Sequence, residues 1–148
     1  MEENFKKRNE DKDLIKKYES LREKNESHYF SQDEFEHIIH HYLERGKNRK
    51  ALKAVNLAIE QYPFVIDFLV HKAQCYSNLQ EFGIAISILE KASNLHPGDS
   101  EIFLIKGNVH ALKGEHEEAL RDTQHHHIQY SAQRPLPGWQ YRAGLLHP

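Results

Sequence analysis

The chain has 148 residues, with 20 Lys and Arg against 22 Asp and Glu, and this balance excludes an overall electric field that would attract nucleic acid or an anionic membrane. Its single cysteine, Cys75, excludes an intramolecular disulfide framework and favours a reducing compartment, so we expect a cytoplasmic protein. No apolar run is long enough for a signal-peptide core or a membrane span, and we therefore expect neither a leader nor an anchor.

The first predicted element is a helix near the N-terminus. Residues 1–12 are almost wholly charged or polar and are expected to form a mobile tail. Asp13 can cap a helix that should end near Asn25. The apolar face of this helix consists of Leu14, Ile15, Tyr18 and Leu21. Because this helix does not fit the pattern that follows, residues 1–30 are predicted to be a charged tail and an N-terminal capping helix.

From residue 31 to residue 122 the sequence repeats with a period of 34 residues, so that Pro63 recurs as Pro97. The other matching columns are Phe35, Leu69 and Phe103; Ile39, Ala73 and Gly107; Tyr42, Tyr76 and His110; Ala51, Ala85 and Ala119; and Ala58 and Ala92. A fixed period of this size is typical of stacked helical units and predicts an all-α repeat fold.

Each repeat is predicted to be a helical hairpin. In the first repeat, Ser31 can cap a helix that ends at Gly46, and a second helix follows. The second repeat should turn near Gln80. Bulky residues should fill the space between hairpins, and small residues should allow their helices to approach closely. The three units cover residues 31–64, 65–98 and 99–122, and since the last is incomplete, we predict about 2.5 hairpins.

The third unit departs from the pattern. We expect it to begin at Ser100 and to turn at Gly114, but after Asp122 the apolar period is lost. Prolines and glycines disfavour a long helix over residues 123–148. One interpretation is an irregular or disordered tail, and the other is a change of reading frame or gene boundary near residue 122. Reading the coding DNA one or two bases out of step would distinguish the two.

These repeats resemble the tetratricopeptide repeat (TPR) family over roughly residues 32–122. The family's residue types stand together in the second unit at Ala73, Tyr76, Ala85, Ala92 and Pro97. The family's usual tryptophan and leucine are replaced by Phe35 and Ile38, and by Leu69 and Lys72. The resemblance implies an α–α superhelix, a TPR-like solenoid, that binds a protein or peptide and is not an enzyme.

The resemblance also implies that the first helix of each hairpin lines a concave surface. The solvent-facing residues at these positions are Asp33, Glu36, His37, His40, Leu43 and Glu44; Asp67, Val70, His71, Gln74, Ser77 and Asn78; and Glu101, Leu104, Ile105, Asn108, Ala111 and Leu112. This surface changes from acidic and imidazole-rich to apolar, which favours a basic or amphipathic peptide ligand. The apolar end is open to a partner, or it is covered by the tail, by a further unit or by self-association through the incomplete third repeat.

One ligand class is excluded by charge. Many TPR proteins hold the C-terminal carboxylates of chaperones with lysine, asparagine and arginine. The corresponding residues here are Glu36, His40, His71, Glu101 and Ile105. Two carboxylates would repel a terminal carboxylate, so we do not expect this chain to bind chaperone tails.

The 12 histidines raise a second hypothesis, a metal- or pH-responsive module. His37 and His41 are one helical turn apart, a spacing that can chelate zinc, and His40 should lie across from His71. Residues 125–127 form another histidine cluster. Clustered imidazoles become charged as the pH falls through about 6.5. Because no cysteine partner or carboxylate triad stands at a recognised metal spacing, surface histidines without a metal are the favoured interpretation, and no cofactor is expected.

Catalytic motifs are lacking in the sequence, which has no glycine-rich phosphate loop, nucleophile motif or metalloprotease signature. Cys75 stands beside Tyr76 on a packed helix and is expected to be a buried, inert thiol. We therefore expect a binding adaptor, and a third possibility is a structural or oligomerising piece of a larger assembly.

Overall fold

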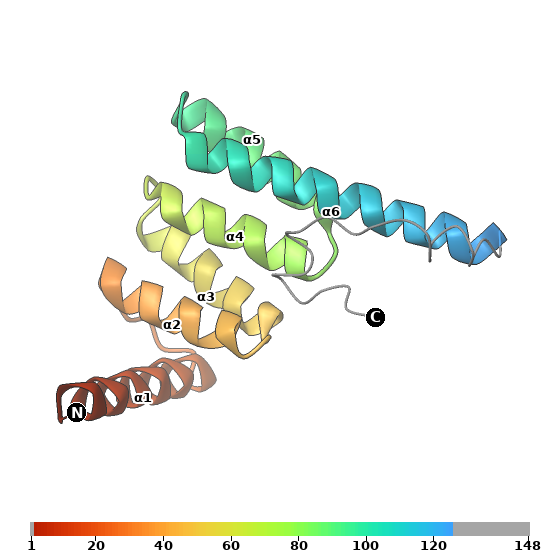
Figure 1. The fold of residues 1–148 in the computed structure, drawn as a ribbon. Coiled ribbons are helices and arrows are strands. Elements are labelled where there is room, and N and C mark those ends of the chain that lie inside the picture. The colour runs from red at the N-terminus through yellow and green to blue at the C-terminus, as the bar shows by residue number, and fades with distance from the viewer. Residues whose placement is uncertain (1, 126–148) are drawn as a thin grey trace. The chain divides into compact units, whose positions relative to one another are not determined.

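The described part of the chain is helical. A computed structural model describes residues 2–125, with residues 121–125 described as backbone alone. These residues form six helices and no strand. The helices, labelled in Figure 1, are α1 (Glu2–Glu23), α2 (Gln32–Glu44), α3 (Asn48–Gln61), α4 (Ile66–Asn78), α5 (Phe82–Leu95) and α6 (Ser100–His125). The predicted all-α class is confirmed for this part of the chain. The predictions for residues 126–148, which include His126 and His127, lie outside the described residues.

The helix boundaries repeat with the period of the sequence. Helices α2 and α4 each have 13 residues and begin at Gln32 and Ile66. Helices α3 and α5 each have 14 residues and begin at Asn48 and Phe82. In both cases the offset is 34 residues, and the start of α6 at Ser100 continues the series from Ile66. The sequence period is therefore a period of backbone structure through the first two units.

The turns between paired helices are also equivalent. Gly46 has a φ of 70° and Gln80, one period later, has a φ of 64°. The N–H of the next residue then closes each turn on a carbonyl five residues back, in the bonds Lys47 to Tyr42 (2.9 Å) and Glu81 to Tyr76 (2.8 Å). Both predicted turns are observed. Gln80 adopts the left-handed conformation although it lacks the freedom of glycine.

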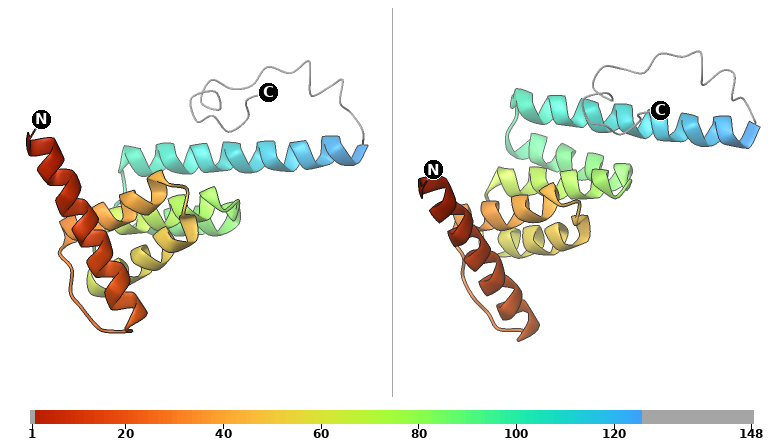
Figure 2. Two further views of the ribbon diagram at one scale, coloured as in Figure 1. Left: turned by 90° about the horizontal axis from the view of Figure 1, so that it is seen from below. Right: turned by 60° about the horizontal axis from the view of Figure 1, so that its bottom comes forward.

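Consecutive helices pack against each other from α1 to α5, and Figure 2 gives two further views of this order. The core around α2 and α3 contains the buried residues Phe30, Phe35, Ile38, Ile39, Tyr42, Ala51, Ala54, Val55, Ala58, Phe68 and Cys75. Phe35 of α2 meets Phe68 of α4 edge to face, with ring centroids 6.1 Å apart. This geometry adds to burial because the positive edge of one ring faces the negative face of the other. It also ties the first helices of the two hairpins together.

Helix α1 begins earlier than predicted, at Glu2 rather than at Asp13. Its first two turns are exposed to solvent, so packing does not hold them in place. Glu and Lys are good helix formers, and Glu2 and Lys6 stand four residues apart in the favourable orientation for an ion pair along a helix. The expected packing of α1 on α2 is observed, and the Tyr42 hydroxyl donates a hydrogen bond to Glu19 Oε2 at 2.8 Å.

Helix α6 corrects the prediction of a third hairpin. It runs from Ser100 to His125 without a turn at Gly114, and it extends beyond the predicted loss of helix at Asp122. Gly114 lacks the positive φ of Gly46, and strong helix formers follow it. A helix tolerates an internal glycine at a cost of about 1 kcal/mol relative to alanine, so the glycine alone does not end it.

Two residues of the repeat pattern behave differently on α6. Phe103 was expected to fill the space between hairpins, as Phe35 and Leu69 do, but it is 60% exposed, and Gly107 is exposed too. Because α6 does not turn at Gly114, the described residues supply no second helix of a third hairpin to pack on Phe103.

The chain divides into two compact units, Met1–His110 and Ala111–Pro148. The boundary falls within α6, and the described part of the second unit, residues 111–125, continues that helix. Among residues 2–125, none of the helices combines the length and the apolar content that crossing a bilayer requires.

Candidate functional site

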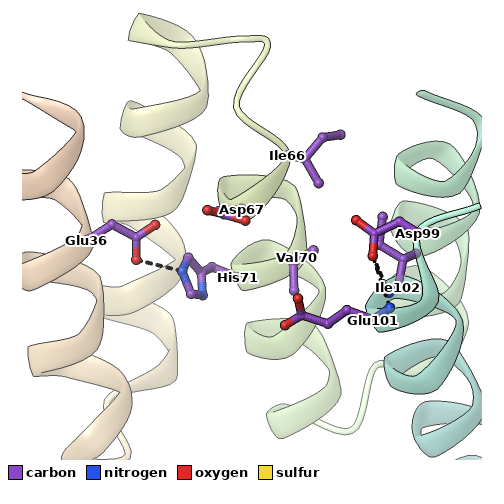
Figure 3. Close-up of a pocket in the computed structure, with 8 residues that line it drawn as sticks. All are labelled: Glu36, Ile66, Asp67, Val70, His71, Asp99, Glu101 and Ile102. Carbon is purple, nitrogen blue, oxygen red and sulfur yellow. Dashed lines mark hydrogen bonds and ion pairs between the residues drawn. The ribbon is translucent and has the colours of Figure 1, made fainter. Parts of the chain in front are cut away.

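A cavity of about 330 Å³ lies in the compact unit Met1–His110, between α2, α4 and the start of α6. It is shown in Figure 3 with its lining residues, which are Glu36, Ile66, Asp67, Val70, His71, Asp99, Glu101 and Ile102. Helices α4 and α6 begin 34 residues apart, at Ile66 and Ser100, so they occupy equivalent places in successive sequence repeats. This equivalence explains why both contribute to the cavity. The cavity is thus built from the helices that open each predicted repeat.

The cavity is acidic. Four of the lining residues are Asp or Glu, and none of the described residues that line it is Lys or Arg. Asp99 also has a structural role, because its Oδ1 accepts hydrogen bonds from the backbone N–H groups of Glu101 (3.0 Å) and Ile102 (3.4 Å) at the start of α6. This cap occupies one carboxylate oxygen with helix donors. The other carboxylates, Glu36, Asp67 and Glu101, are the groups that offer negative charge to a ligand.

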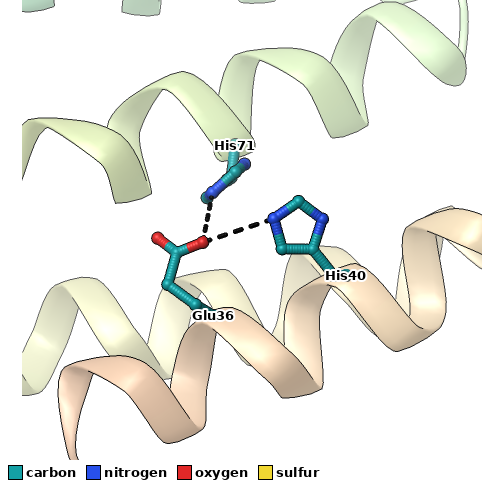
Figure 4. A group of neighbouring side chains, drawn as sticks. All are labelled: Glu36, His40 and His71. Atoms are coloured by element: carbon teal, nitrogen blue, oxygen red, sulfur yellow. Dashed lines mark hydrogen bonds and ion pairs between the residues drawn. The ribbon is translucent and has the colours of Figure 1, made fainter. Parts of the chain in front are cut away.

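Glu36 and His71, which line the cavity, form a cluster with His40 (Figure 4). Glu36 Oε2 lies 2.9 Å from His71 Nε2 and 3.5 Å from His40 Nε2. The two imidazole rings meet edge to face with centroids 5.3 Å apart, so the expected position of His40 across from His71 is observed. Since a carboxylate only accepts hydrogen bonds, Nε2 of His71 must carry the hydrogen in this arrangement.

The other nitrogen of His71 has no such partner. The His71 side chain is only 14% exposed, and its Nδ1 is buried without a hydrogen-bond partner among the described residues. A buried polar atom without a partner carries a desolvation cost. Among the described residues, His71 is therefore hydrogen-bonded through Nε2 but not through Nδ1.

The structure brings together only some of the predicted concave-face residues. Glu36, Asp67, Val70, His71 and Glu101 line the cavity, and His40 joins them through Glu36. The predicted residues that do not line it are Asp33, His37, Glu44, Gln74, Asn78, Leu104, Ile105 and Asn108.

Three of the lining residues were missed by the sequence analysis. They stand at the beginnings of α4 and α6. Ile66 directly precedes the predicted residue Asp67, Ile102 directly follows the predicted residue Glu101, and Asp99 caps α6. The signal that points to them is the helix start itself, because the cavity is lined by residues at the starts of α4 and α6.

Among the side chains that the structure describes, the predicted metal pair His37 and His41 belongs to no larger ligand group. His37 Nδ1 lies 3.8 Å from Asp11 Oδ1 of α1. Burial, and after it the charge of Arg45, lowers the pKa of His41 below its ordinary value. Among residues 2–120, whose side chains the structure describes, the group of three metal-ligating side chains is Glu36, His40 and His71. The proximity of three potential ligands therefore favours this cluster over the predicted pair.

Cys75 is buried on α4, as expected. Burial raises the pKa of its thiol to about 11. Because the thiolate is the nucleophilic form, this thiol is unreactive near neutral pH.

A second cavity of about 350 Å³ lies between α1, the segment after it and α3. Residues that line it include Tyr18, Tyr29, Phe30 and Gln61. The Gln61 side-chain amide makes two hydrogen bonds to this segment: its Nε2 donates to the carbonyl of His28, and its Oε1 accepts from the N–H of Phe30. The cavity thus adjoins the junction of the capping helix with the first hairpin, and no predicted site residue lies in it.

The geometry defines an acidic cavity among three helices, with a Glu–His–His cluster beside it. Comparison of the chain with models of protein families, with curated proteins and with solved structures finds no match. The function is therefore inferred from these side chains themselves.

Proposed function

We propose that this chain is a non-enzymatic adaptor with a TPR-like superhelical fold, and that α2, α4 and α6 present an acidic surface to a basic or amphipathic peptide. The observation that carries the proposal is the cavity that these three helices line with carboxylates and without Lys or Arg among the described residues. The 34-residue recurrence of helix boundaries supports the superhelix. The single cysteine supports a cytoplasmic location.

The chemistry of the cavity favours an arginine side chain as the anchor of the peptide. Asp67 and Glu101 offer carboxylates from two different helices, and a guanidinium group can bond more than one carboxylate at once. The apolar side chains of Ile66, Val70 and Ile102 provide a wall for the aliphatic stem of the same residue. An amphipathic peptide with arginine beside an apolar residue would use both kinds of surface.

Fluorescence anisotropy with labelled peptides would test this proposal. Two peptides of equal length would carry either arginine or glutamate in the same alanine and leucine context, and only the arginine peptide should bind. The double variant Asp67→Asn, Glu101→Gln should bind it about tenfold more weakly, because two exposed ion pairs contribute at most about 1 kcal/mol each. Added salt should reduce the affinity of the unmodified protein more than that of the variant.

Glu44→Gln is the matched control. Glu44 is an exposed carboxylate on α2 that does not line the cavity, and its neutralisation should leave the affinity unchanged. Equal binding of both peptides would contradict the proposal, and so would equal losses from Glu44→Gln and from the cavity variant.

Self-association is a second candidate function, and the apolar surface of α6 supports it. Phe103 and Leu104 are 60% and 68% exposed. Large exposed apolar side chains favour contact with another protein surface, here a second copy of the chain. Sedimentation velocity over a range of concentrations should then reveal a dimer that Leu104→Glu dissociates. A monomer at all concentrations would exclude this function.

A further inference from the structure

The cluster of Glu36, His40 and His71 has the donor set of a transition-metal site. It offers one carboxylate oxygen and two imidazole nitrogens, and these three atoms all lie within 4.8 Å of one another. Imidazole nitrogen and carboxylate oxygen are preferred ligands of Zn²⁺, whereas Mg²⁺ and Ca²⁺ prefer oxygen alone. We propose that Glu36, His40 and His71 bind a zinc ion.

The distances suit zinc with small movements. Zinc binds nitrogen and oxygen at about 2.0–2.2 Å, so two ligand atoms at a tetrahedral centre lie about 3.3 Å apart. Glu36 Oε2 is 2.9 Å from His71 Nε2 and 3.5 Å from His40 Nε2, which brackets this separation. The zinc ion would sit between these groups and replace the hydrogen bond between His71 and Glu36.

The backbone already holds the ligands in place. Glu36 and His40 are four residues apart on α2, so their side chains extend from the same face of the helix. His71 comes from α4, and α2 and α4 both pack on α3 and also meet through Phe35 and Phe68. A site whose ligands come from packed helices needs little ordering when the ion binds.

Zinc binding requires a change of tautomer at His71. The hydrogen on Nε2, which now faces Glu36, must move to Nδ1 so that Nε2 can donate its lone pair to the metal. Because Nδ1 has no hydrogen-bond partner among the described residues, the move breaks no other bond of the ring. The Nε2 hydrogen bond to Glu36 is the one that is lost, and the metal bond replaces it.

The site is open to solvent on one side. His40 is 54% exposed and Glu36 is 28% exposed, so an ion can enter past them. Three protein ligands leave a fourth tetrahedral position, which water fills when zinc is bound. This open position is where a further ligand atom would attach.

Titration calorimetry with zinc chloride tests the proposal on the full chain. His125, His126 and His127 are first replaced by alanine, because consecutive histidines could bind metal by themselves. One zinc ion should bind. His40→Ala, His71→Ala and Glu36→Gln should each weaken binding by about 100-fold or more, because even the loss of a residue that merely supports a ligand costs 10–100-fold.

His37→Ala is the matched control, since His37 is an exposed histidine on the same helix outside the cluster, and it should leave zinc affinity unchanged. His40→Ala changes an exposed residue, so its far-UV circular dichroism should match that of the parent even if His71→Ala perturbs the fold. Proton and nitrogen resonances of His71 should report the tautomer change. Unchanged affinity in His40→Ala, or an equal loss in His37→Ala, would overturn the proposal.

Discussion

Replacement of Gly114 by alanine tests the continuity of α6 by the sign of its effect. The first two units turn at Gly46 and Gln80 with positive φ, whereas Gly114, in the same column, lies inside a helix. A Cβ atom built at Gly114 meets nothing within 4 Å. Gly114→Ala should therefore stabilise α6 locally by about 1 kcal/mol, the difference in helix propensity between the two residues.

The same substitution at Gly46 should have the opposite effect. Gly46 has a φ of 70°, and a Cβ atom there also has open space around it, so backbone strain alone is tested. Gly46→Ala should destabilise the first unit by about 1 kcal/mol after the smaller unfolded-state entropy of alanine is set against the left-handed strain. Gln80→Gly should stabilise the second unit by a smaller amount, because it relieves the same strain at a φ of 64°.

Amide hydrogen exchange is the assay for α6, and urea unfolding is the assay for the turns. Exchange of the amides around Gly114 should slow by about fivefold in Gly114→Ala, which is the factor that corresponds to about 1 kcal/mol. Circular dichroism should show no loss of helix. Faster exchange in this variant, with an effect of the same sign as Gly46→Ala, would place Gly114 in a turn and would restore the third hairpin that the sequence predicts.

Three further predictions concern the Cys75 thiol, the pKa of His41 and the effect of zinc on peptide binding. Cys75 should resist iodoacetamide at pH 8 in the folded protein and react in urea, because burial raises its pKa to about 11; labelling in the folded state would contradict its burial. The pKa of His41 is lowered from 6.5 by burial and then by Arg45, so the unfolded chain binds more protons and stability should fall as the pH drops below about 6.5. The urea midpoint of His41→Gln should vary less with pH than that of the unmodified protein. An equal variation in the two proteins would exclude His41 as the cause of the pH dependence. Zinc should weaken binding of the arginine peptide in the anisotropy assay, and Glu36→Gln should abolish this effect of zinc. A peptide affinity that does not change with zinc would show that the two proposed sites are independent.

The sequence predicts α2 to α5 well because several local signals agree there. The Ser31 hydroxyl accepts a hydrogen bond from the backbone N–H of Glu34, and the Glu34 carboxylate accepts one from the backbone N–H of Ser31. The predicted cap is therefore a full capping box. Gly46 turns the chain as glycine does at the end of a helix. The second unit then follows from the period, even at Gln80, where the residue itself gives no sign of a left-handed turn. Repetition thus supplied information that local propensity lacked.

Two errors arose, one at Gly114, where the repeat pattern predicts a turn that is absent, and one at Asp13, where a single cap residue predicts the helix start. Gly114 was interpreted through the column of Gly46, but a glycine ends a helix only where the chain takes a positive φ, and no sequence rule fixes φ. Asp13 is predicted to be a cap, but the charged residues before it are good helix formers, and α1 begins at Glu2. In the candidate site, the column pattern predicted Glu36 and His71 on one surface. Their bond through Nε2 depends on side-chain rotamers, which the period does not determine.

Glu36 links the two proposed activities, because it is both a wall of the acidic cavity and a ligand of the zinc cluster. In the absence of metal its carboxylate accepts from His71 and still contributes negative charge to the cavity. A zinc ion adds two positive charges at this point and leaves the Glu36 carboxylate neutralised. A cationic peptide then meets a less favourable potential, and by thermodynamic linkage the peptide must weaken zinc binding by the same factor. A neutral or acidic ligand with a donor atom for the open zinc position would show the reverse coupling, so zinc would change which ligand the same three helices prefer.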